Sequence, residues 1–278
     1  MTTSLLARDL LESKAESLDW LSHKLLVFIA WMDDYGASTV SWRQVGLFSF
    51  LVLAVIKLVL GKRRGIDWYG LFHALVTGIG AAACIYLDVV ASETLTGFPE
   101  PQRSCQCLPP LTSLHRILPA ISTGYSILDT YDGAKTGPAF LAHGIATGFV
   151  MVYFSEINAP HIVVSFLLME VSTVFFNLLH AEMMSKKVKF IVQLSFAFFF
   201  FVCRILISPI VWVRLCLAMY KASLSEHSTF PYCYHSLISL VAFLLGMFFH
   251  ILNAYWFYKI VMKARRTLRG DDAKTKRS

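Results

Sequence analysis

Charged residues are scarce in this sequence. Asp, Glu, Lys and Arg together make up 15% of the 278 residues, whereas 56% of the residues are hydrophobic and 14% are aromatic. Soluble globular domains contain roughly 25% charged residues. The composition therefore excludes an ordinary soluble domain and is typical of a polytopic membrane protein.

Alternating ten-residue strands separated by turn signals are also absent, which argues against a transmembrane β-barrel. Seven long apolar segments are present instead, at 44–61, 69–92, 112–131, 139–155, 160–180, 189–215 and 235–259. Each approaches or exceeds the roughly 20 residues that a helix needs to cross a bilayer. The sequence predicts an all-α membrane protein with about seven transmembrane helices in a domain over 44–265.

The N-terminus lacks the early apolar core of a cleavable signal peptide. Within the N-terminal segment 1–43, the stretch LDWLSHKLLVFIAWMDD at 18–34 predicts an amphipathic helix at the membrane surface. An eighth span at 18–32 is the alternative, although this stretch is short for a transmembrane helix.

Basic residues alternate with the loops. They gather at 62–64, at Lys135, at 186–189 and in the tail 266–278, and the intervening loops hold fewer. The positive-inside rule then predicts a cytosolic C-terminus and a lumenal N-terminus. No nucleic-acid recognition motif accompanies the net charge of +7, so we expect membrane lipids as partners and no nucleic acid. The sequence predicts no particular oligomeric state.

The final residues KTKRS place Lys274 and Lys276 near the C-terminus. On a cytosolic tail this pattern resembles the dilysine signal that returns membrane proteins to the endoplasmic reticulum. We therefore expect the protein in the endoplasmic reticulum or a related internal membrane.

Three of the six cysteines lie in loops that the predicted topology places on the lumenal side, namely Cys105, Cys107 and Cys233. A disulfide between Cys233 and one of the other two would form in an oxidising lumen. Free or palmitoylated thiols are the alternative, and both remain open. The CxC spacing does not fit a zinc site, so no metal is expected.

A polar stripe runs along one of the apolar segments. In LLMEVSTVFFNLLH at 167–180, Glu170, Thr173, Asn177 and His180 fall within a sector of roughly 80° on a helix. A polar stripe in lipid needs a polar space to face. The stripe therefore predicts that this helix turns toward an internal cavity, although Asn177 and His180 would equally meet lipid headgroups.

Polar residues of other segments lie at similar depths in the cytosolic half of the membrane. We expect a lipid cavity lined by His73, Asp129, His143, Glu170, Thr173, Asn177, His180, Arg204, His250 and Asn253. Glu170 and Arg204 lie near mid-membrane on consecutive helices. They are predicted to pair, with a protonated Glu170 as the alternative, because an unpaired charge there costs at least about 2.5–3.5 kcal/mol. A structural ion pair that holds two helices in register is a simpler explanation of this pattern than a role in ligand binding.

Two of these residues would suit acid–base chemistry. Asp129 and His143 are expected at similar depth on adjacent helices, where a carboxylate can orient an imidazole. A polar contact that closes a helix hairpin is the simpler interpretation. His73 and His250 are more simply explained as hydrogen-bonding residues between helices.

Four motifs in this order resemble the TLC domain family. They are GYSILD at 124–129, LAHGIAT at 141–147, EINAPHIVVSFLLMEVSTVFFNLL at 156–179, and FFFFVCRI followed by LNAYWFYKI. The family includes ceramide synthases, translocon-associated membrane proteins and small lipid-homeostasis proteins. The resemblance implies a bundle of helices with a lumenal N-terminus and a cytosolic C-terminus.

The resemblance also implies two functions. Ceramide synthases use two adjacent histidines in acyl transfer, but here His143 is followed by Gly144. We therefore expect a non-enzymatic protein that binds lipid or acyl chains in membrane lipid homeostasis, without a cofactor. The alternative is an N-acyltransferase that uses acyl-CoA and a sphingoid base, with His143 as the catalytic group and Asp129 beside it.

Other seven-helix classes are less well supported. The last apolar segment lacks a mid-helix lysine for a retinal Schiff base, and no receptor signature is present. The two halves show no internal repeat of the kind common in transporters.

Overall fold

The computed structural model describes residues 41–92, 113–156, 160–224 and 236–269. Helices account for nearly all of these residues, so the prediction of an all-α polytopic membrane protein is confirmed. Four unbroken helices are α2 (Trp42–Val59), α3 (Trp68–Ser92), α5 (Ser113–Thr136) and α6 (Pro138–Glu156). The last helix, α11 (Ser236–Arg269), is the longest.

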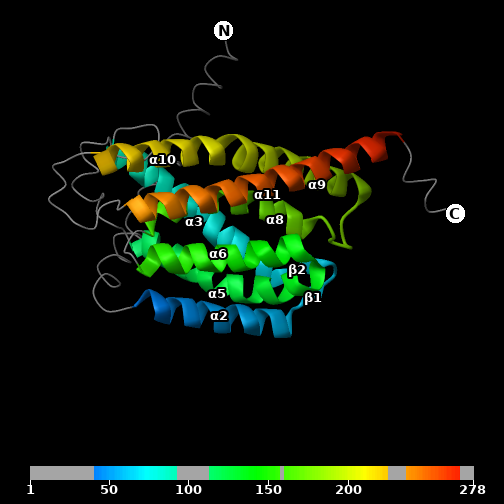
Figure 1. Ribbon diagram of the computed structural model, residues 1–278. Helices are drawn as coiled ribbons and strands as arrows, with labels where there is room; N and C mark the ends of the chain where they lie inside the picture. The colour runs from blue at the N-terminus through cyan, green and yellow to red at the C-terminus, as the bar shows by residue number, and fades with distance from the viewer. Residues whose placement is uncertain (1–40, 93–112, 157–159, 225–235, 270–278) are drawn as a thin grey trace, which may run out of the picture.

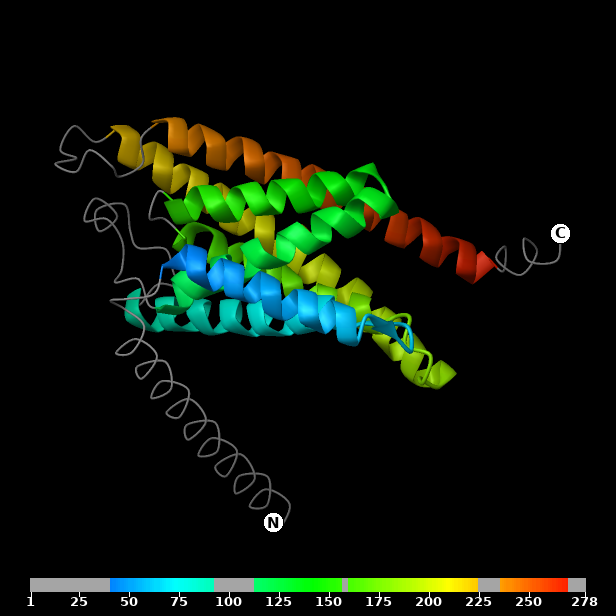
Figure 2. The same ribbon diagram turned by 90° about the horizontal axis from the view of Figure 1, so that it is seen from below.

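Two further rods are each built from three consecutive helical pieces. The first comprises α7 (His161–Val164), the 3₁₀ helix η1 (Ser165–Met169) and α8 (Glu170–Leu178). The second comprises α9 (Lys186–Phe199), the π-helix η2 (Phe200–Ile207) and α10 (Ser208–Leu224). Figures 1 and 2 show all the long helices running side by side in one bundle.

Five described helices are long and apolar enough to cross a bilayer. They cover Trp42–Val59, Trp68–Tyr86, Pro138–Glu156, Lys186–Leu217 and Ser239–Arg266, and a shorter apolar helix covers Ile162–Leu178. The seven predicted segments all coincide with helices. That the predicted segments 112–131 and 160–180 also cross the membrane stays a prediction.

A small hairpin joins α2 to α3 and was not predicted from the sequence. Strand β1 (Lys62–Arg63) pairs antiparallel with β2 (Ile66–Asp67). Gly61, Arg64 and Gly65 adopt positive φ angles in this tight connection. The Glu182 amide donates to the Arg64 carbonyl at 2.9 Å, which fastens the hairpin to the residues after α8. We call this end of the bundle the hairpin end, and the other the loop end.

Small residues let neighbouring helices approach closely, as is common in membrane bundles. A Cβ atom at Gly124 of α5 would lie 2.6 Å from the Gly46 carbonyl oxygen of α2. A Cβ atom at Gly144 of α6 would lie 2.8 Å from the Thr130 amide nitrogen of α5. Glycine is therefore required at both crossings, which bring α2, α5 and α6 into one tightly packed layer.

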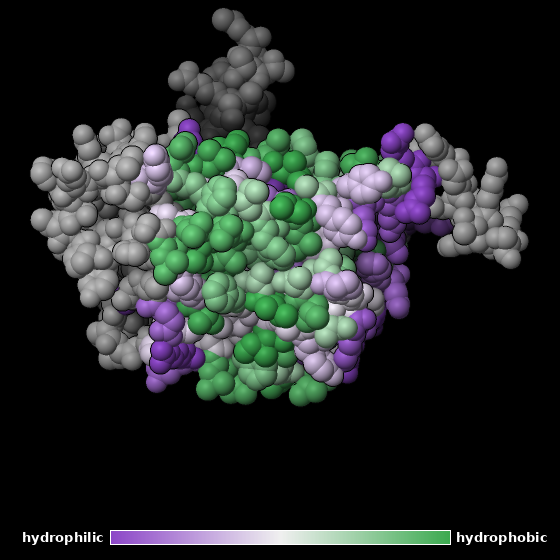
Figure 3. Space-filling view, in the orientation of Figure 1, coloured by the Kyte–Doolittle hydropathy of each residue, from purple (hydrophilic) through white to green (hydrophobic). Residues whose placement is uncertain are grey.

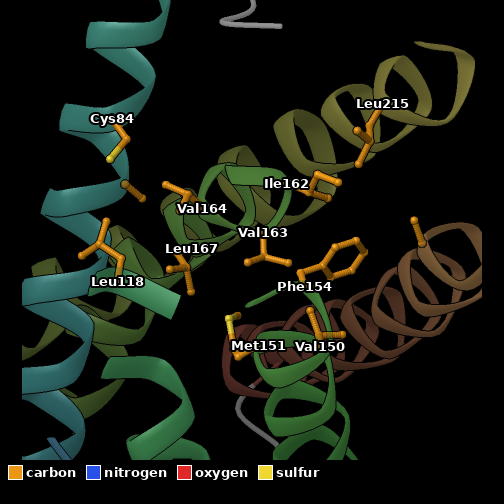
Figure 4. Packing of buried hydrophobic residues seen from close by; sticks show 12 residues of the cluster. Cys84, Leu118, Val150, Met151, Phe154, Ile162, Val163, Val164, Leu167 and Leu215 are labelled. Atoms are coloured by element: carbon orange, nitrogen blue, oxygen red, sulfur yellow. The ribbon is translucent and has the colours of Figure 1, made fainter. Parts of the chain in front are cut away.

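The main hydrophobic core lies toward the loop end. Figure 4 shows its side chains converging from α3, α5, α6, α7, η1 and α10, among them Leu118, Phe154, Ile162 and Leu215. Large apolar side chains also cover the outer surface of the bundle, and Figure 3 shows a green apolar band on the face in view, with hydrophilic residues gathered toward its ends. Such a surface is suited to contact with hydrocarbon chains.

Candidate functional site

A cavity opens among four of the rods. It is bounded by α6, by α7 and η1, by η2 and α10, and by α11. Its empty volume is about 760 Å³ including its open side. We call it the chamber. Its walls are mainly apolar and include Val150, Phe154, Ile162, Leu167, Leu215 and Phe249.

The chamber has charged groups at one end only. Glu170 and Arg204 line it near the middle of their rods, and the remaining lining residues run from them toward the loop end. We call the group of Glu170, Arg204 and Asn253 the floor of the chamber. The chamber thus extends from the floor toward the loop end, and the cavity expected in the cytosolic half stays a prediction.

Arg204 is the centre of the floor. Its Nη2 atom lies 3.7 Å from Glu170 Oε1, so the predicted pairing is confirmed. Its guanidinium also donates to Ser172 Oγ at 2.9 Å, to Thr173 Oγ1 at 2.9 Å and to Asn253 Oδ1 at 3.3 Å. The charge is thus held by one carboxylate and three neutral acceptors, which satisfy a group that would be costly to bury alone.

Both members of the pair occupy irregular stretches of helix. Glu170 begins α8 directly after the 3₁₀ helix η1, and Arg204 lies within the π-helix η2. Pro209 follows η2 in the sequence, and a proline has no amide hydrogen for the carbonyl four residues earlier, at Ile205. The wide turn before Pro209 accommodates this missing bond, and π-bulges of this kind are frequent at functional sites.

His143 lies in the chamber, but its neighbours are aromatic. Its ring packs edge-on against Phe249 at 5.8 Å and against Trp256 at 5.2 Å. The next residue, Gly144, faces Thr130 with no room for a side chain. The position where the resemblance would place a second histidine is therefore filled by the α5 backbone.

Asp129 lies away from His143, in a seam between α3 and α5. It accepts a hydrogen bond from the Tyr125 hydroxyl at 3.3 Å. His73 stacks on the Tyr125 ring at 3.8 Å, and its Nε2 atom lies 3.2 Å from Ser122 Oγ. No hydrogen bond or ion pair within the described ranges joins Asp129 to His143, so the expected acid–base pair is not assembled.

The seam continues to the hairpin end, beyond the predicted span 112–131. There Asp132 pairs with Lys57 at 2.8 Å and accepts a hydrogen bond from the Tyr69 hydroxyl. Burial disfavours the charged form of Asp132, but the bonds from Lys57 and Tyr69 outweigh it and lower the pKa of this carboxyl below its ordinary value. This cluster ties α2, α3 and α5 together.

The rest of the polar stripe on α8 stays outside the chamber. Thr173 binds Arg204 from beside the floor. Asn177 is buried and donates to the Thr173 carbonyl at 3.0 Å, with its side chain against Gly70. His180 is exposed at the hairpin end. Of the ten predicted cavity residues, five line the chamber, namely His143, Glu170, Arg204, His250 and Asn253.

Several predictions fall on residues outside the described ranges. The pairing of Cys105, Cys107 and Cys233, the amphipathic helix at 18–34, and the tail lysines Lys274 and Lys276 all belong to this group.

Three polar residues that line the chamber were missed by the sequence reasoning, namely Thr147, Ser208 and Trp212. Ser208 and Trp212 follow Arg204 at intervals of four residues. A search for residues at helical spacing from a buried charge would have found them.

A family model described as the TLC domain matches residues 63–262, well over half of the chain. Among curated proteins, none matches this sequence.

Proposed function

Because the chain belongs to the TLC domain family, we propose that it binds a lipid by its acyl chain inside the chamber and acts in membrane lipid homeostasis. The proposed role is non-enzymatic. The proposed location is the endoplasmic reticulum, with the N-terminus in the lumen and the hairpin end and C-terminus in the cytosol, as the basic loops favour.

The apolar chamber is the observation that carries this proposal. It is a concave site whose lining is mainly apolar, with a few polar side chains at one end, as is common in sites that bind small molecules. Its walls come from residues such as Val150, Phe154 and Leu167, which offer dispersion contacts to a hydrocarbon chain. The bound acyl chain would stop at the paired charges of the floor, near mid-membrane.

Acyl transfer is the second candidate, and one observation favours it: His143 lines the same chamber. Two others count against it. Asp129 accepts a hydrogen bond from Tyr125, and none joins it to His143 among the described residues; Gly144 is packed against Thr130. Acid–base catalysis needs a positioned partner within hydrogen-bond reach, so lipid binding without reaction fits this geometry better.

A chamber-filling substitution tests the proposal. Ala242 of α11 is buried and lines the chamber, whereas Leu244 on the same helix is 56% exposed. We expect Ala242→Phe to reduce co-purified lipid several-fold in native mass spectrometry of the purified protein. Leu244→Phe introduces the same ring on the outer surface and should leave the lipid content unchanged.

Two results would contradict lipid binding. One is wild-type protein that carries no lipid after mild extraction. The other is an Ala242→Phe variant that is folded and monodisperse yet retains as much lipid as Leu244→Phe.

A further inference from the structure

Several buried polar atoms that line the chamber have no hydrogen-bond partner among the described residues. They are His143 Nδ1, Ser208 Oγ, Trp212 Nε1 and both ring nitrogens of His250. A buried donor or acceptor left unpaired costs about 1–3 kcal/mol. Their concentration around one cavity indicates that the chamber takes something more polar than a plain hydrocarbon chain.

Three of these residues form one group beside the floor. Ser208 follows Arg204 by four residues, and His250 precedes Asn253 by three. Both therefore lie about one helical turn, or roughly 6 Å, from the floor on the loop-end side. The Trp212 and His250 rings are 4.9 Å apart. We call Ser208, Trp212 and His250 the upper polar cluster.

The upper polar cluster is built into the fold. Ser208 is only 4% exposed. The Trp212 indole rests on Gly246, where an added Cβ atom would overlap Nε1, and it stacks on Phe243 at 5.3 Å. A glycine on α11 thus leaves room for the indole to pack against this helix at the wall of the chamber.

The charge of the chamber argues against an anionic headgroup. Arg204 is the one Lys or Arg among the described lining residues. Its guanidinium is already held by Glu170 and by the Ser172 and Thr173 hydroxyls. A carboxylate or phosphate would therefore enter a site whose positive charge is already compensated. New ionic contacts would not offset the free-energy cost of removing the anion from water.

The chemistry of the upper polar cluster selects a hydroxyl. The Trp212 N–H can only donate, so it needs an acceptor. The Ser208 hydroxyl and the His250 imidazole can each donate and accept. A hydroxyl group beside an ester or amide carbonyl supplies both a hydrogen-bond donor and hydrogen-bond acceptors and carries no charge.

We propose that the chamber binds an uncharged lipid with a free hydroxyl, of the diacylglycerol type, and recognises the hydroxyl and adjacent carbonyl through Ser208, Trp212 and His250. This inference rests on the proposed lipid-binding function and specifies its ligand class. The acyl chain then lies along the apolar walls toward the loop end.

The test compares 1,2-dioleoylglycerol with its 3-deoxy analogue, dioleoyl propane-1,2-diol, which lacks only the hydroxyl. Both compete for the full-length protein in detergent, and native mass spectrometry counts the bound species. We expect the wild type to prefer dioleoylglycerol about tenfold, as one lost buried hydrogen bond implies. Ser208→Ala and His250→Phe should reduce this preference to about threefold or less.

A matched control is available in α6. The Ser155 hydroxyl is also buried and unpaired among the described residues, but it does not line the chamber. Ser155→Ala should keep the full preference for dioleoylglycerol. If either cluster variant fails to fold, Trp212→Phe provides a further test: it removes the N–H donor for the ester carbonyl, which both probes keep, and should weaken the binding of both probes several-fold.

The other outcomes overturn the inference in distinguishable ways. Equal binding of the two probes, or stronger binding of oleate or phosphatidic acid, refutes hydroxyl recognition but leaves lipid binding intact. A preference that survives in all cluster variants places hydroxyl recognition elsewhere. Retention of none of these lipids refutes the inference and the proposed function together.

Discussion

Arg204 is held mainly by hydrogen bonds to neutral side chains. The carboxylate of Glu170 is 3.7 Å away, whereas the Ser172 and Thr173 hydroxyls accept at 2.9 Å. Arg204 therefore depends less on Glu170 than Glu170 depends on Arg204. Arg204 keeps three acceptors if Glu170 loses its charge, but Glu170 loses its neighbouring cation if Arg204 is removed.

This asymmetry predicts unequal effects of two substitutions. Arg204→Met leaves a buried carboxylate without its cation and should lower the free energy of unfolding by about 3–5 kcal/mol. Glu170→Gln should cost only about 1 kcal/mol, because the hydrogen bonds to Arg204 remain. Thermal unfolding of the purified variants in detergent would compare them.

The same arginine change at the surface provides the control. Arg43 pairs with Glu156 at 2.6 Å, but their side chains are 70% and 43% exposed. Arg43→Met should cost less than about 1 kcal/mol. Equal losses for Glu170→Gln and Arg204→Met would contradict the asymmetry.

Residue-level reasoning from the sequence identified the charged pair but not its surroundings. Counting residues from the helix ends placed Glu170 and Arg204 at matched depth, and that was sufficient to predict the contact. Asp129 and His143 also have matched depth, yet they face different helices. Depth is a one-dimensional quantity, and the rotation of each helix about its axis is set by packing that no single helix encodes.

At the scale of elements, the irregular pieces η1 and η2 shape the site. A hydrophobic run such as 189–215 predicts a helix but says nothing about a change in its hydrogen-bonding pattern. Pro209 was the signal for η2 in the sequence, because a proline has no amide hydrogen to donate to the carbonyl four residues earlier. Within this wider turn, Arg204 lines the chamber.

This explanation predicts the effect of replacing the proline. Pro209→Ala restores an amide hydrogen that can reach the Ile205 carbonyl, so part of η2 should convert to regular α-helix. We expect slower amide hydrogen exchange over 200–207 and a reduced amount of co-purified lipid, because Arg204 would rotate relative to the floor.

Pro119 inside α5 provides a matched control. Pro119→Ala makes the same change in a helix that does not line the chamber, and it should leave exchange over 200–207 unaltered. Unchanged exchange in Pro209→Ala would show that the π-helix has another origin.

The helices themselves were well predicted, and their bounds differ mostly by a few residues from the apolar segments. The hairpin was missed because Gly61 and Gly65 flank a basic run that was interpreted only as a topology signal. The chamber was expected where polar residues are dense. Most of the lining side chains of the chamber are apolar and come from α6, α7, η1, α10 and α11, and how these helices pack against one another is not encoded in any single segment.

At the scale of the whole molecule, the two ends of the bundle differ in charge. The hairpin end holds Lys62, Arg63 and the start of α9, where Lys186 and Lys187 are exposed. Toward the loop end, the described chain holds Arg43, which pairs with Glu156, and also Arg116, Arg214 and Lys221, fewer basic residues than the hairpin end. An excess of basic residues on one side is the feature that fixes orientation during insertion.

The orientation can be tested by cysteine labelling. In a background with Cys105, Cys107 and Cys233 replaced by serine, Lys187→Cys should react with an impermeant maleimide from the cytosolic side of sealed microsomes. Arg43→Cys should react only after the membrane is permeabilised. The reverse pattern would invert the proposed topology and leave the chamber geometry unaffected.

The compensated floor has an electrical consequence. A potential of 100 mV across a membrane acts on each elementary charge that crosses it with about 2.3 kcal/mol. Glu170 and Arg204 sum to zero at nearly the same depth, so the field exerts almost no net force on them, and an uncharged occupant adds none. Voltage should therefore leave loading and unloading of this protein unbiased, whichever way the field across its membrane points.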